Sequence, residues 1–343
     1  MLAIIADDLT GALDSAAPFA GRGLHTEVAL RPEAVSQALR EKPAVLTVNI
    51  GSRDLDKDGA QRATELALSL LPQGTILFKK VDSRLKGHIA AELDVTPFRS
   101  ALAAPAIPDF GRIVKSGRLE GFGVDEPISV ADRLGRHAAR CIIPDIGDQA
   151  EMRAALEAAQ GAGCDLLIGA RGLADALARQ MTGDEALRPA EIPEGPALFV
   201  IGSRDPITLA QVEMLRQIHP LAYGAAENGE LTQQAIHDEL PLTLVQATSG
   251  AFPCTPAEVS ANLAESVHPR LTARTKTLLM SGGATAEAVL SKMGISRFRL
   301  LGECLPGLGI AYSQGYCIIA KSGGFGQSGT LVELTNMILR KME

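Results

Sequence analysis

The segment between Thr277 and Gly326 restricts the possible folds more than any other part of the chain. An apolar strand predicted over 277–280 runs into the sequence SGGAT (281–285), which opens directly onto a helical pattern. A second apolar strand, predicted over 316–321, ends in the sequence SGGFG (322–326). This alternation predicts an open α/β sheet, and sheets of this kind bind ligands at the carboxyl ends of their strands.

The paired glycines at these strand ends favour a ligand that carries phosphate. Glycine reaches positive φ and lets a ligand lie against bare backbone amides. A helix start adds unpaired N–H groups and a partial positive charge. Tight turns alone would explain one such loop, whereas two within about 50 residues favour a binding site. Neither loop matches GxxxxGK[ST] or a GxGxxG that opens a first βαβ unit, so the two commonest nucleotide motifs are absent.

Length and composition narrow the class of protein. A chain of 343 residues is long for a single core, so two domains are expected. The net charge is −7, aromatic residues make up 3%, and tryptophan is absent. These values argue against a nucleic-acid or membrane-surface partner, because such partners select basic patches and, for single strands, aromatic stacking platforms.

Other features favour a cytoplasmic protein without a structural metal. The first residues reach two aspartates too early for a signal peptide, and no apolar run approaches the ~18 residues of a membrane span. The five cysteines are scattered and never form CxxC, which is typical of reduced thiols. The six histidines show no zinc-ligand spacing.

In the first half of the chain, polar residues follow strands predicted over 2–6, 44–49 and 75–81. The parallel βαβ pattern would bring these strand ends to one edge of a sheet, which makes them a candidate site. Aspartate at such a junction often caps the next helix instead. Capping explains one carboxylate, but not Asp7 beside Asp8 with Asp14 close by and a charged cluster over 79–86.

The periodicity breaks down between Ala101 and Pro144, where a loop or hairpin over the site is expected. The proline-rich stretch 183–196 predicts a linker between an N-terminal domain (1–182) and a C-terminal domain (197–343). The second domain begins with another α/β alternation. In it, Ser203 follows a strand and either contacts phosphate or caps the next helix.

The two halves together favour phosphoryl transfer. Glycine amides in one domain suit phosphate, and mixed aspartate, lysine and arginine in the other suit a small polyhydroxy or carboxylate substrate. A cleft between two domains, each a largely parallel sheet flanked by helices, would hold donor and acceptor together and exclude water. The residues alone therefore predict a kinase or another nucleotide-using transferase.

Motifs spread over nearly the whole chain resemble the four-carbon acid sugar kinases. The motifs, in chain order, are IADDLTGALDSA, NIGSR, KKVDSRLKG, IGARGLADAL, VIGSRDP, SGGATAEAVL and IIAKSGGFG. This family, long catalogued as a domain of unknown function, includes D-threonate, D-erythronate and 3-oxo-tetronate 4-kinases. The resemblance implies an N-terminal domain that binds the acid sugar and a C-terminal domain that binds ATP. Mg²⁺ is expected as a cofactor, and the γ-phosphoryl group would pass to the C4 hydroxyl of the acid.

The strand-end pattern and the resemblance together predict the site residues. Asp8 and Asp82 are the candidates for the catalytic base, and the resemblance does not decide between them. The predicted substrate-binding residues are Asp7, Asn49, Ser52, Arg53, Lys80, Ser83 and Arg84. The predicted nucleotide-binding residues are Ser203, Ser281, Gly282, Gly283, Ala284, Thr285, Gly323 and Gly324. No residue is assigned to the metal.

Departures from the family pattern leave the substrate open. The family usually has Asn-Thr-x-Ser-Arg where this chain has NIGSR (49–53), and Arg84 and His88 replace smaller or amide residues. Two other functions are considered. A dinucleotide-dependent oxidoreductase would need GxGxxG in the first βα turn, which here is ADDLTG. A non-catalytic sensor of sugar acids fits the same residues, and a homo-oligomer is an option that the sequence leaves open.

Overall fold

A computed structural model describes residues 1–183, 186–232, 236 and 240–340. The chain divides into two compact units, Met1–Arg188 and Pro189–Glu343. The division falls inside the stretch 183–196 that the sequence predicts as a linker, of which residues 184–185 lie outside the described part. Ala190 and Ile192 of this stretch are buried against the core of the second unit. Each unit is described by itself.

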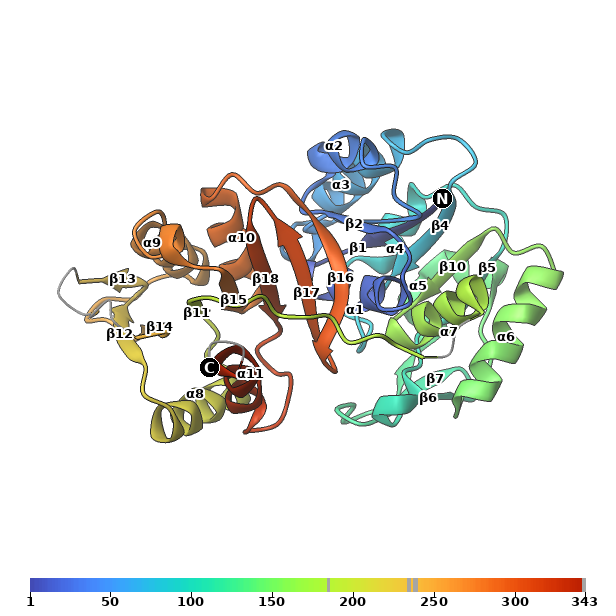
Figure 1. The fold of residues 1–343 in the computed structure, drawn as a ribbon. Coiled ribbons are helices and arrows are strands. Elements are labelled where there is room, and N and C mark those ends of the chain that lie inside the picture. Colours follow the sequence, from blue (N-terminus) through green and yellow to red (C-terminus); the bar gives the residue numbers. More distant parts are fainter. Residues whose placement is uncertain (184–185, 233–235, 237–239, 341–343) are drawn as a thin grey trace. The chain divides into compact units, whose positions relative to one another are not determined.

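The first unit contains a parallel sheet with the strand order β2-β3-β1-β4-β10-β5-β9 (Figure 1). Its strands are β1 (Leu2–Ala6), β2 (Thr26–Ala29), β3 (Val45–Asn49), β4 (Ile76–Lys80), β5 (Ala101–Ala104), β9 (Cys141–Ile142) and β10 (Leu166–Gly169). A small antiparallel sheet is made of β6 (Arg112–Lys115), β7 (Arg118–Gly121) and β8 (Ile128–Ser129). The helices are α1 (Leu9–Ala20), α2 (Val35–Leu39), α3 (Lys57–Ser69), α4 (Ile89–Asp94), α5 (Val130–Leu134), α6 (Gln149–Gly161) and α7 (Arg171–Thr182).

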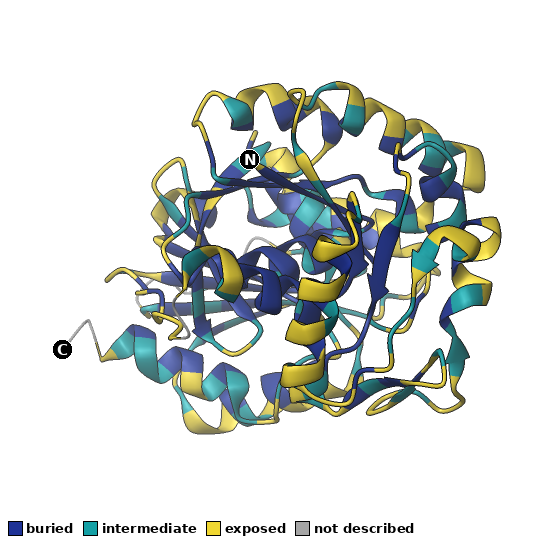
Figure 2. Cartoon of the chain, turned by 90° about the vertical axis from the view of Figure 1, so that its right-hand side faces the viewer, coloured by how far each residue is buried: buried dark blue, intermediate teal, exposed yellow. Residues whose placement is uncertain are grey.

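Helices cover both faces of this sheet, which is why the central strands β1 and β10 are apolar along their whole length and β4 becomes polar only at its carboxyl end. Helices α1, α6 and α7 pack together, and α2 and α3 lie over the side chains of Ile5, Leu46 and Val48. Every residue of β1 is buried. Figure 2 shows the buried strands inside a layer of helices whose outer faces are exposed.

The second unit contains a mixed sheet with the strand order β13-β12-β14-β11-β15-β18-β17-β16. Strands β12, β14, β11, β15 and β18 are parallel, whereas β13, β17 and β16 join antiparallel at the two edges. The strands are β11 (Ala197–Ile201), β12 (Ala222–Glu227), β13 (Glu230–Leu231), β14 (Leu242–Thr248), β15 (Thr277–Ser281), β16 (Arg297–Leu305), β17 (Leu308–Ser313) and β18 (Tyr316–Lys321). The helices are α8 (Pro206–Ile218), α9 (Pro256–Val267), α10 (Gly283–Lys292) and α11 (Thr330–Leu339), with α8 packed on α11 and α9 on α10.

The fold class predicted from the sequence is confirmed: both units are α/β, with largely parallel sheets flanked by helices. Two segments differ from expectation. The region 101–144 contains the predicted hairpin, β6–β7, but also β5 and β9 of the main sheet. Before the strand predicted over 316–321, the structure adds β17, for which no strand was expected and which pairs with both β16 and β18. In the described ranges, no helix has both the length and the apolar character that crossing a membrane requires.

We predict that Gly172→Ala destabilises the first unit. A Cβ at Gly172, in the first turn of α7, would lie 2.3 Å from the backbone oxygen of Ala106, and backbone cannot yield as a side chain can. The expected loss is about 1–3 kcal/mol of unfolding free energy, measured by urea denaturation. Gly161→Ala, at the end of α6 where nothing lies within 4 Å, is the matched control. An equal effect of the two substitutions would contradict the steric explanation.

Candidate active site

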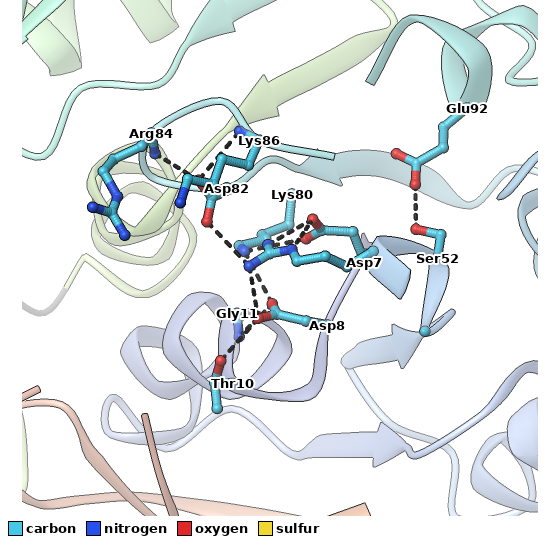
Figure 3. Close-up of polar contacts among 12 residues, drawn as sticks. Asp7, Asp8, Thr10, Gly11, Ser52, Lys80, Asp82, Arg84, Lys86 and Glu92 are labelled. Carbon is cyan, nitrogen blue, oxygen red and sulfur yellow. Dashed lines mark hydrogen bonds and ion pairs between the residues drawn. The ribbon is translucent and has the colours of Figure 1, made fainter. Parts of the chain in front are cut away.

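Three neighbouring strand ends of the first unit carry the predicted charged residues. Asp7 and Asp8 follow β1, Arg53 lies in a 3-10 turn (Ser52–Asp54) after β3, and Asp82 follows β4. Strands β3, β1 and β4 are adjacent and parallel, so their carboxyl ends lie at one edge of the sheet. Figure 3 shows the side chains of Asp7, Asp8 and Asp82 turned toward one another there.

The guanidinium group of Arg53 joins the carboxylates of Asp7, Asp8 and Asp82. Its Nε and Nη2 donate to Asp7 Oδ2 at 2.9 and 2.6 Å. Its Nη1 lies 3.1 Å from Asp8 Oδ2 and 3.2 Å from Asp82 Oδ1. Charge-assisted bonds from a planar guanidinium fix both distance and direction, so the positions of the carboxylates are tightly defined.

Lys80 is the second cation of the site and is almost completely buried. Its Nζ lies 3.3 Å from both Asp7 Oδ1 and Asp8 Oδ1. Burial lowers the pKa of Lys80, but the charges of Asp7 and Asp8 outweigh this and raise it, so the ammonium stays charged. A Cβ at Gly11 would lie 1.9 Å from this Nζ, which explains the glycine in the first turn of α1.

Asp7 is fixed in its ionised form. Burial raises the pKa of this carboxyl. The positive charges of Lys80, Lys79 and Arg53 lower the pKa by more than burial raises it, so that it falls to about 2. With only 3% of the residue exposed, Asp7 holds the two cations in place and is a poor proton acceptor. Asp8 and Asp82 are more accessible, with 25% and 14% of their side chains exposed.

Asp8 and Asp82 also organise the loops that carry them. Asp8 caps α1 by accepting from the backbone N–H of Gly11 at 2.9 Å, and it accepts from Thr10 Oγ1 at 3.0 Å. Asp82 Oδ2 accepts from the backbone N–H groups of Arg84 at 2.8 Å and Lys86 at 3.2 Å. Asp8 therefore both caps α1 and belongs to the charged cluster.

The structure does not bring every predicted substrate residue to the cluster. Asn49 is buried; its side chain donates to Leu30 O and accepts from the N–H of Gly51, so it shapes the turn. The Ser52 hydroxyl donates to Glu92. Ser83 is half-buried and Arg84 exposed, and the Arg84 side chain points away from the carboxylates in Figure 3.

Sequence reasoning missed several charged residues near this edge. Glu92 of α4 accepts from Lys79 Nζ at 2.7 Å, and Arg171 at the start of α7 lies 3.0 Å from Asp14. Arg112, at the start of β6, donates from Nε and Nη2 to Phe122 O at 3.1 and 2.8 Å, and burial, with the charge of Arg84, lowers its pKa. The adjacent lysines of β4 were a usable signal for Glu92, because a buried lysine needs a carboxylate partner.

In the second unit, the predicted glycine loops meet at the ends of adjacent parallel strands β11, β15 and β18. The N–H groups of Gly202 and Ser203 both donate to Ser281 O at 3.1 Å, and the N–H of Gly282 donates to Lys321 O at 3.0 Å. Asp205, not Ser203, caps α8, by accepting from the N–H of Ile207. Ser203 Oγ instead accepts from the N–H of Asp205 at 3.2 Å.

The glycines of these loops are required by close packing and by backbone geometry. A Cβ at Gly323 would lie 2.1 Å from Ser203 Oγ, and one at Gly324 would lie 3.1 Å from Asp205 Oδ2. Gly282 has φ +107 and caps α10 without a side chain. The first amides of α10, at Gly283, Ala284 and Thr285, therefore start a helix whose end no side chain covers, which is a site suited to phosphate.

Lys321, the last residue of β18, binds the backbone of the second glycine loop. Its buried Nζ donates to Thr208 Oγ1 at 3.1 Å, Ser322 O at 2.9 Å and Gly323 O at 3.2 Å. Burial lowers the pKa of Lys321 to about 8, although the charge of Asp205 acts in the opposite direction. The three donors of the ammonium are used, so Lys321 fixes the loop rather than reaching a ligand.

The two halves of the chain match two family models. Residues 2–124 match the sugar-binding N-terminal domain, and residues 198–331 match the nucleotide-binding C-terminal domain. The chain belongs to the family defined by this pair of domains. This confirms the family predicted from the sequence motifs.

Curated relatives align along almost the whole chain. A D-threonate kinase from Cupriavidus necator is 28% identical over 96% of this chain and 95% of its own length. D-Threonate kinases from Salmonella typhimurium and Bordetella bronchiseptica are 27% and 25% identical, covering 96% and 98% of this chain and 96% and 97% of their own lengths.

Solved structures share the fold. A Salmonella typhimurium protein described as a putative tRNA synthase has a TM-score of 0.75 with 19% identity, over 98% of this chain and 99% of its own. A Haemophilus influenzae protein of a family of unknown function has a TM-score of 0.73 with 19% identity, over 98% and 100%. At this identity the likeness concerns the fold alone.

The depressed pKa of Asp7 predicts a pH-dependent contribution to stability. The unfolded chain takes up a proton near pH 3.8, whereas folded Asp7 resists until about pH 2. The stabilisation, about 2 kcal/mol, is therefore complete above about pH 5 and is lost as the pH falls toward 2. In urea denaturation, the difference in unfolding free energy between wild type and Asp7→Asn should narrow below pH 5. A difference that stays constant down to pH 3 would contradict the assignment.

Proposed function

We propose that the protein is a kinase that transfers the γ-phosphoryl group of ATP to the C4 hydroxyl of a four-carbon sugar acid. The observation that most strongly supports this proposal is the charged cluster at one sheet edge of the sugar-binding unit. Its members are Asp7, Asp8, Asp82, Arg53 and Lys80. It supplies carboxylates to orient a hydroxyl and fixed cations to offset the charge of a phosphoryl group. The names of the curated relatives support the same chemistry.

Among the carboxylates, Asp8 is the better candidate to orient and deprotonate the acceptor hydroxyl. Asp7 is buried and its pKa is about 2. Asp8 and Asp82 each hold backbone N–H groups of their own loops and contact Arg53, so exposure is what separates these two residues. Asp8 is the most exposed of the three. In phosphoryl transfer, positioning of the hydroxyl matters more than the strength of the base.

The acid itself would lie with its hydroxyl end toward the cluster. The cluster holds three carboxylates and two cations, so it disfavours a further carboxylate. The exposed guanidinium group of Arg84, which lies on the loop that carries Asp82, is the better partner for the carboxylate of the acid.

ATP would bind to the second unit, with its phosphates on the amides of Gly283, Ala284 and Thr285. In the described part of the chain, no group of three or more His, Cys, Asp or Glu residues is placed to hold a metal ion. This fits Mg²⁺, which in kinases is carried on phosphates with one or two carboxylates. Asp205, beside the Gly324 loop, is the candidate carboxylate, and the ion would neutralise phosphate charge. Transfer also requires the two ligands to meet in a cleft that excludes water, as predicted from the sequence.

The reaction is tested by ADP release from ATP and Mg²⁺ with D-threonate, D-erythronate and their 3-oxo forms. We predict that Asp8→Asn lowers kcat by about 10²–10⁴-fold, because the hydroxyl loses its proton acceptor. Asp125→Asn, at an exposed position, is the control and should leave kcat unchanged. A larger loss of kcat in Asp82→Asn than in Asp8→Asn would show that Asp82, and not Asp8, is the proton acceptor. Wild-type turnover on none of the acids would favour the sensor.

The nucleotide site is tested separately by Gly323→Ala. The added Cβ would displace Ser203 and the loop, so we expect the Kd for ATP, measured by calorimetry without acid, to rise about tenfold or more. Gly329→Ala is the matched control, since nothing lies within 4 Å of its Cβ and its φ is −83. Equal ATP affinities of the two variants would argue against binding at this loop.

A further inference from the structure

A buried polar bridge lies behind the charged cluster of the first unit. The Glu92 residue is 1% exposed, and its two carboxylate oxygens have different partners. Oε2 accepts from Lys79 Nζ at 2.7 Å, and Oε1 accepts from the hydroxyl of Ser52. Figure 3 shows Ser52 and Glu92 facing each other, apart from Asp8 and Asp82. Ser52 itself is fully buried.

The two adjacent lysines of β4 have different partners because consecutive side chains of a strand point to opposite faces of the sheet. Lys79 and Lys80 are consecutive in β4, so their side chains leave opposite faces of the sheet. Lys80 reaches Asp7 and Asp8, whereas Lys79 reaches Glu92 on α4. One strand therefore anchors both the carboxylates of the site and the helix that supports the neighbouring turn.

The turn that Glu92 supports carries Arg53. Ser52 is the first residue of the 3-10 turn, and Arg53 follows it directly. The backbone N–H of Arg53 donates to Asp7 O at 3.2 Å, which holds the turn from its other side. The guanidinium group contacts three carboxylates at once. This requires that the backbone of the turn hold Arg53 in one orientation.

Stability alone is a weak explanation for this bridge. A buried ion pair gains little over apolar residues of the same size, because both charges must be removed from water. Ile89 and Leu93, on the same helix as Glu92, belong to the apolar core of this unit, so an apolar side chain at position 92 is chemically possible. Glu92 instead accepts, with one oxygen, a hydrogen bond from the Ser52 hydroxyl next to Arg53.

We propose that Glu92 is a positioning residue of the kinase site, which acts through Ser52 to hold Arg53 in the orientation that gathers Asp8 and Asp82. The inference rests on the proposed function for its catalytic meaning, but its structural content stands without turnover. It also changes the role predicted for Ser52, whose hydroxyl serves Glu92 and does not contact the substrate.

The decisive measurement is the solvent exchange of the Arg53 Nε–H, which donates to Asp7 and can be followed in protein labelled with ¹⁵N at arginine Nε. Arg53→Lys identifies the signal. In Ser52→Ala the turn loses its bond to a charged group, so exchange should accelerate about tenfold or more. Ser69→Ala, which removes an exposed hydroxyl bonded to Leu66 O, should leave the exchange rate unchanged.

A kinetic arm tests the link to the reaction. Ser52→Ala should raise KM for the acid and lower kcat while leaving the Kd for ATP unchanged. It should add nothing further when Arg53 is already lysine, because both changes act through one side chain. Glu92→Gln, which retains an acceptor for only one partner, should behave in the same direction.

Each outcome decides between a positioning role and a structural one. Unchanged exchange of the Arg53 Nε–H in folded Ser52→Ala would overturn the proposal, as would additive losses with Arg53→Lys. Failure of both Ser52→Ala and Glu92→Gln to fold would show that the bridge is structural. If wild type turns over no acid, the proposed function fails, and accelerated exchange still supports the positioning of Arg53.

Discussion

The first unit depends on one electrostatic constraint: three carboxylates lie at the edge of one sheet, and Arg53 contacts all three while Lys80 contacts two of them. Without Arg53, the carboxylates of Asp8 and Asp82 would repel each other across a partly buried surface. A lysine offers a point charge, whereas the planar guanidinium presents donors in several directions at once. Lys80 balances the other side of Asp7. The loops after β1, β3 and β4 therefore have one arrangement in which all these charges are satisfied.

The parts of this site that could be predicted are those that depend on local sequence. An apolar run followed by aspartate marks the end of a buried strand, and parallel strands bring such ends together wherever they lie in the chain. The glycine loops after β15 and β18 were predictable for the same reason. The pairing of Ser52 with Glu92 was not, since 40 positions separate them and α4 is a helix of six residues. Distant partners of this kind decide which polar side chains of a loop are already engaged within the protein.

The strands that were missed have a common cause. β5 reads ALAA and β9 has two residues, so neither carries a periodic signal that distinguishes a strand from a loop. β5 becomes a strand because β10, more than 60 residues later, pairs with it in parallel. β17, for which no strand was expected, pairs antiparallel with both β16 and β18. Tertiary pairing overrode local preference in both cases.

Both units place their candidate sites at strand ends, yet they use different chemistry there. The nucleotide-binding unit presents backbone amides, and its fixed requirements are glycines such as Gly323, where a Cβ would collide with Ser203. Backbone amides bind phosphate whatever the rest of the ligand is. The sugar-binding unit presents side chains held by ion pairs, and under the proposed function these side chains would contact the acid. Differences in substrate between members of this family should therefore arise from the loops after β1, β3 and β4, while the glycine loops stay as they are.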